Sequence, residues 1–236
     1  MTTSSVDYSD FTIIIPTLNE EKSIGKLISE IEKNAPKSSI IISDDGSSDK
    51  TKEITESYDG DVKVNFLNRK EEKSHGLTVS VLDAILKCST PYFLVMDGDL
   101  QHPPNTISQF HFLLQQNYDI VTGKRIEVIG RWSIQRKLMS YVARILGKFA
   151  LLIRRRNLIK DVMTGFFASK RDIWIPVIQE QKNKFILEGY KVLFDFLKIY
   201  KRKLKTTHVE YVFGTRDYGE SKISKRIIWL YFKSLF

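Results

Sequence analysis

The chain has 236 residues, of which 42% are hydrophobic and 28% are charged, a balance that suits one α/β domain with a filled core. Its single cysteine, Cys88, excludes an internal disulfide and fits a reducing compartment. The stretch nearest to a membrane span, residues 138–153, is interrupted by Arg144 and Lys148, so no segment reaches the ~20 apolar residues of a spanning helix. The polar first residues predict no signal peptide.

Charge is unevenly distributed along the chain. Residues 1–130 hold 13 Lys and Arg against 20 Asp and Glu, whereas residues 131–236 hold 24 against 8, and the whole chain has a formal net charge of +9. Residues 131–160 carry nine basic side chains and no acidic one. A half this basic predicts that the protein binds an anionic surface or an anionic substrate. On charge alone, both a nucleic acid and a membrane are candidates.

In the first half, short apolar runs alternate with segments of helical periodicity. Strands are predicted at 11–16, 39–43, 62–67, 92–96 and 119–122. Helices are predicted between these strands, with Asn19 as the N-cap of the first helix and Pro103-Pro104 in the first turn of the last. This alternation predicts an α/β fold with a mostly parallel sheet, right-handed crossovers and helices on the flanks.

The pattern changes after Gly130. Residues 131–156 are basic and compatible with a helix, and residues 223–236 mix Trp229, Tyr231 and Phe232 with lysine and arginine. Basic amphipathic helices with aromatic side chains are typical of a membrane interface, which is one interpretation of both segments. The alternative is that their apolar stripes pack on the sheet, as amphipathic helices of globular proteins do.

Acidic groups follow three of the predicted strands: Asn19-Glu20, Asp44-Asp45 and the pair Asp97 and Asp99. Parallel strands bring their carboxyl ends to one edge, where open α/β sheets bind ligands, so these groups are expected to converge. Two neighbouring carboxylates repel each other unless a cation lies between them. A divalent ion held by a few carboxylates keeps positions open for substrate phosphates, so the pattern predicts a metal–diphosphate site. Each cluster alone could also be the capped start of a helix.

Five blocks, in chain order, carry a family resemblance: Ile-Pro-Thr-Leu-Asn-Glu (15–20), Ser-Asp-Asp-Gly-Ser-Ser-Asp (43–49), Met-Asp-Gly-Asp-Leu-Gln-His-Pro-Pro (96–104), Asp-Val-Met-Thr-Gly-Phe-Phe (161–167) and Phe-Gly-Thr-Arg-Asp-Tyr-Gly-Glu-Ser-Lys (213–222). The first three resemble the signatures of the inverting glycosyltransferase family 2, whose fold is GT-A. The last two resemble the dolichol-phosphate mannosyltransferase branch of that family. Leu18 departs from the pattern, because the family usually has a tyrosine there.

The resemblance implies a role for each residue at a matching position. It implies a GT-A catalytic domain over residues 1–222, with membrane-facing helices at 131–160, and a separate interface helix at 223–236. It assigns catalysis to Asp99, Arg125 and Arg216, and Mg²⁺ or Mn²⁺ binding to Asp97, Asp99 and Gln101. It assigns the acceptor phosphate to Arg125, Arg136 and Ser140. It assigns the nucleotide sugar to Pro16, Leu18, Asn19, Glu20, Asp44, Asp45, Asp97, Gly98, Asp99 and Lys222.

The reaction implied by the resemblance is transfer of mannose from GDP-mannose to dolichyl or another polyprenyl phosphate. An alternative within the family is UDP-glucose or another nucleotide sugar as the donor. A nucleic-acid-binding module is disfavoured, because the basic helices carry dense Leu, Ile and Phe and no stacking platform. A non-enzymatic membrane scaffold leaves the acidic strand ends unexplained. We therefore expect an enzyme on the cytoplasmic face of a membrane, peripheral or anchored by segments outside this chain, with no nucleic-acid partner.

Overall fold

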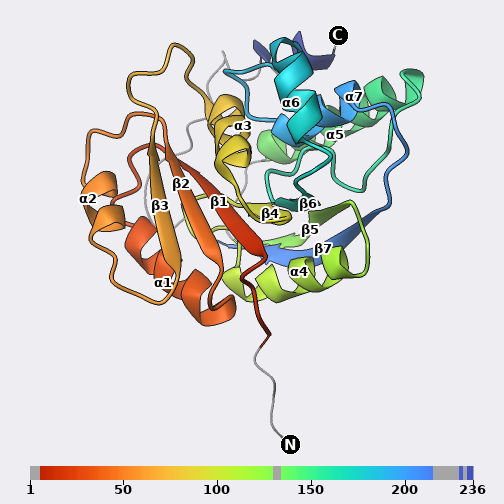
Figure 1. The fold of residues 1–236 in the computed structure, drawn as a ribbon. Helices are drawn as coiled ribbons and strands as arrows, with labels where there is room; N and C mark the ends of the chain where they lie inside the picture. Colours follow the sequence, from red (N-terminus) through yellow and green to blue (C-terminus); the bar gives the residue numbers. More distant parts are fainter. Residues whose placement is uncertain (1–5, 130–133, 215–228, 231–232, 236) are drawn as a thin grey trace, which may run out of the picture.

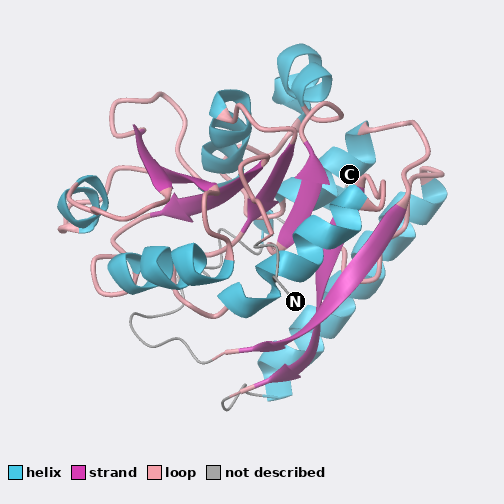
Figure 2. Cartoon of the chain, turned by 60° about the horizontal axis from the view of Figure 1, so that its bottom comes forward, coloured by secondary structure: helices cyan, strands magenta, loops and turns pink. Residues whose placement is uncertain are grey.

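A twisted seven-stranded sheet forms the centre of the protein, with helices on both of its faces (Figures 1 and 2). The computed structural model describes residues 6–129, 134–214, 229–230 and 233–235. The strand order across the sheet is β3-β2-β1-β4-β6-β5-β7. This architecture confirms the α/β fold class, with a mostly parallel sheet, that the sequence predicts.

The first four strands form the parallel half of the sheet. They are β1 (Phe11–Thr17), β2 (Ser39–Asp44), β3 (Lys63–Asn68) and β4 (Tyr92–Val95). Strand β1 pairs in parallel with β2 and β4, and β2 pairs in parallel with β3. All four lie where the sequence predicts strands, and the isoleucine runs of β1 and β2 are typical of strands that are buried on both faces. Their carboxyl ends consequently lie at the same edge.

The second half of the sheet contains one reversal. Its strands are β5 (Ile120–Val128), β6 (Phe167–Lys170) and β7 (Thr206–Phe213). Strand β6 runs antiparallel to both β4 and β5, and β7 pairs in parallel with β5 at the edge. Because β6 is antiparallel, its first residue, Phe167, lies opposite Val95, the last residue of β4. The chain therefore enters the sheet at β6 beside the carboxyl end of β4.

Helices cover the two faces and enclose two apolar cores. On one face α1 and α4 enclose a core that includes Phe11 and Phe110, and on the other α3, α5, α6 and α7 enclose a core around Phe93, Phe167 and Trp174. The helices are α1 (Ile24–Asn34), α2 (Thr51–Glu56), α3 (Leu77–Lys87), α4 (Ile107–Gln115), α5 (Ile134–Ile153), α6 (Ile175–Gln181) and α7 (Val192–Ile199), with short 3₁₀ turns η1 (Pro104–Thr106) and η2 (Lys182–Lys184).

Helix α5 presents two apolar stripes. One stripe, with Ala150 and Leu151 buried, packs on the core beside α7. The other is exposed, with side chains that are 43% to 64% accessible: Met139, Tyr141, Val142, Ile145, Phe149, Leu152 and Ile153. The predicted helix is therefore present, and its second apolar stripe has no cover within the described chain. Among the described helices, none has the length and apolar character needed to cross a membrane.

The described part of the predicted C-terminal helix packs on α7. Leu230, Ser234 and Leu235 are buried, and Lys198 Nζ donates a hydrogen bond to the Ser234 carbonyl. Trp229 is 61% exposed. Tyr231 and Phe232 lie outside the described residues, so the interface role predicted for residues 223–236 stays a prediction.

The predicted helix start at Asn19 is wrong. Helix α1 begins at Ile24, after Ser23. Asn19 has a φ of +55°, in the left-handed region that asparagine tolerates better than most residues. Its Oδ1 accepts a hydrogen bond of 2.8 Å from Ser48 N, so the side chain joins the loops after β1 and β2 instead of capping the helix.

Candidate active site

The loops after β1, β2 and β4 meet at one edge of the sheet, as the sequence predicts. Asp45 N donates a 3.0 Å hydrogen bond to Thr17 O, which joins the β2 loop to the β1 loop. A methyl group added to Gly98 would lie 3.5 Å from Glu20 Cγ and 3.5 Å from Thr17 Cγ2. These are ordinary van der Waals distances, so the acidic loop after β4 lies against the loop after β1.

The loop after β4 presents two carboxylates on a tight turn. The Asp97 side chain is 37% exposed, whereas Asp99 is buried and its Oδ1 accepts a 3.1 Å hydrogen bond from Gln101 N. Leu100, between Asp99 and Gln101, has a φ of +64°. Within the described part of the chain, no three His, Cys, Asp or Glu side chains are grouped as a metal site requires. A metal here would thus need the Gln101 amide or substrate oxygens besides the two carboxylates.

His102 anchors this loop to the protein core. Its Nδ1 accepts a 3.0 Å hydrogen bond from Asp97 N, and its ring stacks on Phe166 with centroids 4.6 Å apart and an interplanar angle of 9°. Burial lowers the pKa of the imidazole to about 3, so the ring is neutral at pH 7. Because Nδ1 is the acceptor, the proton lies on Nε2. The backbone of Asp97 is thereby tied to the aromatic core.

Gln101 joins the acidic loop to the end of β7. Its Nε2 donates to Gly214 O at 3.1 Å, and Gly214 N donates back to Gln101 O at 3.0 Å. Gly214 belongs to the fifth sequence block, which continues to Arg216 and Lys222. Those two residues lie outside the described part of the chain, so their assigned roles stay predictions.

A basic group faces the acidic loop across the block at 161–167. Arg125, on β5, donates to Asp161 Oδ2 at 3.3 Å and lies over the Phe213 ring at 5.5 Å. Asp161 is buried. A methyl group added to Gly165 would lie 3.8 Å from Asp97 Oδ1. The block therefore lies against both the acidic loop and Arg125, and brings the two charges into one site.

Lys191 is a second cation of this site, and sequence reasoning missed it. Its Nζ donates a hydrogen bond to Met163 O and lies 4.3 Å from the Tyr190 ring centroid. Burial, and then the charge of Arg125, lower its pKa to about 8, while Asp161 and Asp97 act in the opposite direction. Lysine 191 precedes an apolar helix and belongs to no recognisable motif, so its place depends on the packing of α7.

Asp44 shapes the loop after β2. It is buried, and its carboxylate accepts hydrogen bonds from Thr17 Oγ1 at 2.9 Å, Ser47 N at 2.8 Å and Gly46 N at 3.1 Å. The lone-pair positions of this carboxylate are thus largely occupied by its own loop and by the end of β1. The structure gives Asp44 a part in holding the predicted nucleotide loop in shape.

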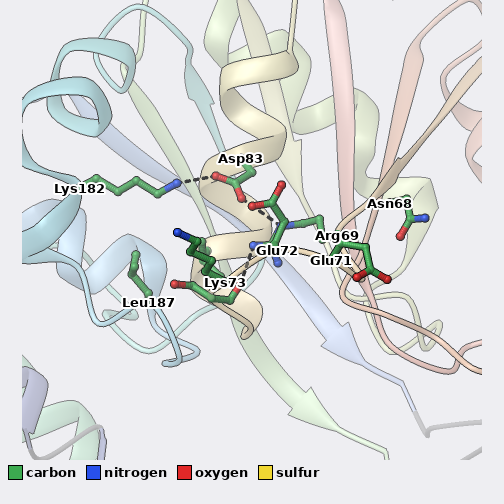
Figure 3. Close-up of a pocket in the computed structure, with 10 residues that line it drawn as sticks. Asn68, Arg69, Glu71, Glu72, Lys73, Asp83, Lys182 and Leu187 are labelled. Carbon is green, nitrogen blue, oxygen red and sulfur yellow. Dashed lines mark hydrogen bonds and ion pairs between the residues drawn. The ribbon is translucent and has the colours of Figure 1, made fainter.

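Asp45 faces a buried arginine that sequence reasoning also missed. Arg69, the residue after β3, pairs with Asp45 through one nitrogen and with Asp83 of α3 through Nε at 3.0 Å. Its side chain is 2% exposed. A polar cavity of about 410 Å³ lies beside this arginine, and Figure 3 shows Asp83 between Arg69 and Lys182.

The remaining predicted residues are placed in two ways. Pro16 is partly buried near the end of β1, and Leu18 is 39% exposed in the loop that follows. Arg136 and Ser140 belong to α5, but their side chains lie outside what the structure describes. Their contact with an acceptor phosphate therefore stays a prediction.

Comparison with known proteins decides the family. The model of Glycosyl transferase family 2 matches residues 12–175. The chain belongs to this family. It is 33% identical over 231 residues to a dolichol-phosphate mannosyltransferase from Pyrococcus furiosus, covering 95% of this chain and 62% of that protein. It is 26% identical to a dolichol-phosphate mannosyltransferase from Saccharomyces cerevisiae, covering 98% of this chain and 86% of that protein.

A solved structure supports the fold. Glucosyl-3-phosphoglycerate synthase from Mycobacterium tuberculosis, in complex with Mn²⁺, UDP and glucosyl-3-phosphoglycerate, has a TM-score of 0.62 over 95% of this chain and 77% of that chain. The two sequences are 16% identical, so the likeness concerns the fold. It confirms the GT-A architecture expected from the sequence blocks.

Proposed function

We propose that this family 2 protein transfers a mannosyl group from GDP-mannose to dolichyl or another polyprenyl phosphate. The observation that carries the proposal is the pairing of two opposite charge groups across one block: the Asp97 and Asp99 carboxylates on one side, and Arg125 with Lys191 on the other. Such a site suits two anionic substrates that must be brought together. The names of the relatives from Pyrococcus and Saccharomyces favour the mannosyl and polyprenyl assignment over UDP-glucose.

Asp97, Asp99 and the Gln101 amide oxygen would hold a divalent metal ion, Mg²⁺ or Mn²⁺. The donor set fits, because carboxylate and amide oxygens are the hard ligands these ions prefer. Space also fits, since Gly165 leaves the side of the Asp97 carboxylate without a neighbouring side chain from that position. When bound, the ion supplies positive charge that stabilises the diphosphate leaving group.

The acceptor needs little activation by the protein. A phosphate monoester has a second pKa near ~6, so it is largely a dianion at neutral pH and already nucleophilic. One of its oxygens forms a bond to the anomeric carbon while the bond from that carbon to the diphosphate oxygen breaks, which inverts the configuration. Arg125 and Lys191 would hold and neutralise the reacting phosphates, with Arg216 as a further predicted partner.

We further propose that the protein works at the cytoplasmic face of a membrane. The exposed apolar stripe of α5 is followed directly by Arg154, Arg155 and Arg156. An amphipathic helix of this kind lies in the interface, with apolar side chains in the acyl boundary and cations at the headgroups. The reacting phosphate of a polyprenyl acceptor lies at the same depth, so this orientation would present the acceptor to the site.

The decisive experiment is product identification. The protein is incubated with Mn²⁺, a polyprenyl phosphate and, separately, GDP-mannose, UDP-glucose and other nucleotide sugars, and the lipid product is identified by mass. We expect a hexosyl polyprenyl phosphate from GDP-mannose. A product formed with UDP-glucose alone would shift the donor to the alternative, and no lipid product with any donor would contradict the proposal.

The membrane proposal predicts that polar substitutions on α5 weaken vesicle binding. Phe149→Ser and Leu152→Ser together remove two side chains that are 60% and 58% exposed. Each apolar side chain contributes about 1.5–3 kcal/mol when fully buried, so we expect affinity for anionic phosphatidylglycerol vesicles to fall at least ~10-fold. Phe112→Ser, on α4 at the opposite face and 58% exposed, is the matched control. Equal vesicle binding by the double variant and the control would contradict the docking of α5.

A further inference from the structure

Arg69 cross-links three segments at the nucleotide side of the site. Besides its pairs with Asp45 and Asp83, its two terminal nitrogens donate to Ser80 Oγ at 2.9 Å and to the Ser74 carbonyl at 2.9 Å. These partners belong to the loop after β2, to the loop between β3 and α3, and to α3 itself. One side chain therefore fixes the relative positions of all three.

The row of paired charges, here called the charge chain, continues from Arg69 through Asp83 to Lys182, and all three residues line the cavity. Lys182, in η2, donates to Asp83 Oδ1 at 2.7 Å, while Arg69 holds Asp83 Oδ2. The exposure of the side chains rises along the chain, from 2% at Arg69 to 23% at Asp83 and 38% at Lys182. Removal of one partner of a buried ion pair is costly, because it leaves the other charge uncompensated, and this applies to the deeply buried Arg69.

Asp45 is the point where this chain reaches the site. Its Oδ2 accepts a 2.6 Å hydrogen bond from Gly76 N, at the start of α3, and its Oδ1 accepts a 3.1 Å hydrogen bond from His75 Nδ1. Its side chain is 12% exposed, whereas that of Arg69 is 2% exposed, so Asp45 is the more accessible of the two to a ligand at the strand ends. Arg69 is too deeply buried to touch a ligand there, and can act on one only through Asp45 and the loop of Gly76.

We propose that Arg69 is a positioning residue for the nucleoside half of the donor. Because Arg69 pairs with Asp45 inside the protein, it orients the Asp45 carboxylate to accept a hydrogen bond from an N–H or O–H group of a base or ribose. Asp83 supports Arg69 by direct pairing, and Lys182 supports it through Asp83. The inference rests on the proposed nucleotide-sugar activity and adds the residues that set donor affinity without contact with the donor.

The test measures binding of GDP with Mn²⁺ by calorimetry, together with donor KM, acceptor KM and kcat. Arg69→Lys keeps the charge but loses the fork that reaches several partners at once. We expect it to raise the Kd for GDP and the donor KM about 10-fold, the loss of roughly one charge-assisted hydrogen bond. The acceptor KM and the kcat at saturating donor are expected to stay within about 2-fold, because Arg69 lies away from the reacting phosphates. Asp83→Asn is expected to act in the same direction by about 3-fold.

Asp10→Asn is the matched control. Asp10 pairs at 2.7 Å with the buried His111 just before β1, at the opposite edge of the sheet. This variant is expected to lower the melting temperature without changing GDP affinity. If Arg69→Lys fails to fold, Asp83→Asn decides. Affinity losses no larger than those of Asp10→Asn would overturn the positioning role. A wild-type protein that binds no nucleoside diphosphate would instead contradict the proposed function itself.

Discussion

Asp99→Asn is expected to reduce transferase turnover by at least ~10²-fold while the protein stays folded. Asparagine keeps an oxygen that can accept the Gln101 N hydrogen bond, so the turn after β4 is retained. The substitution removes one negative charge from the pair that would hold the metal ion. Loss of one electrostatic stabiliser of a transition state typically costs ~10²–10³ in rate, which sets the size of the effect.

Two further measurements separate this role from a structural one. The affinity for Mn²⁺ in the presence of GDP should fall along with turnover, whereas the melting temperature should change little. Asp10→Asn again serves as the control, because it alters a carboxylate at the other edge of the sheet. Activity of Asp99→Asn above about a tenth of wild type at saturating Mn²⁺ would contradict the metal role of Asp99.

The parallel half of the sheet could be predicted from the sequence because its signals are local. Runs such as Ile13-Ile14-Ile15 and Ile40-Ile41-Ile42 are apolar on both faces, and such runs are typical of strands covered by helices on either side. The rule that parallel strands end at one edge then brings Asp45, Glu20 and Gly98 together without further information. The structure confirms this convergence.

The antiparallel strand could not be predicted in the same way. β6 has four residues, and its place between β4 and β5 depends on pairing with strands that are distant in the sequence. Its direction nevertheless decides the site, because it sets the block at 161–167 against Asp97 and Arg125.

The side-chain partners inside the site could not be predicted from the sequence either. The spacing of Asp44 and Asp45 shows that both follow a strand, but not that the first is used by its own loop and the second by a buried arginine. Arg69 lies in a polar stretch where a solvated arginine is the ordinary expectation. Only the packing of α3 against the loop after β3 gives it four partners.

Lys191→Met is expected to reduce kcat/KM by about 10²-fold, because it removes a cation that stands with Arg125 opposite the acidic loop. Methionine has similar length and an unbranched stem, so packing against Tyr190 should be largely kept. Met163 O, which Lys191 contacts, would lose that hydrogen bond, and melting temperatures are compared for this reason. A variant with wild-type kcat/KM would show that the lysine has only a structural part.

The pH dependence gives Lys191 a signature that a structural role would not have. With a pKa lowered to about 8 in the unliganded protein, the ammonium is present below pH 8 and is lost as the pH rises through that value. Since kcat/KM reports the groups of the unliganded enzyme, it should fall above pH 8 in the wild type. Lys191→Arg should work less well at pH 7, because the two cations differ in shape, but should keep its activity up to about pH 10, since a guanidinium does not lose its proton there. The Lys191→Met variant should lose the alkaline limb altogether. An alkaline limb that is identical in all three proteins would assign it to another group and contradict the role of the Lys191 charge.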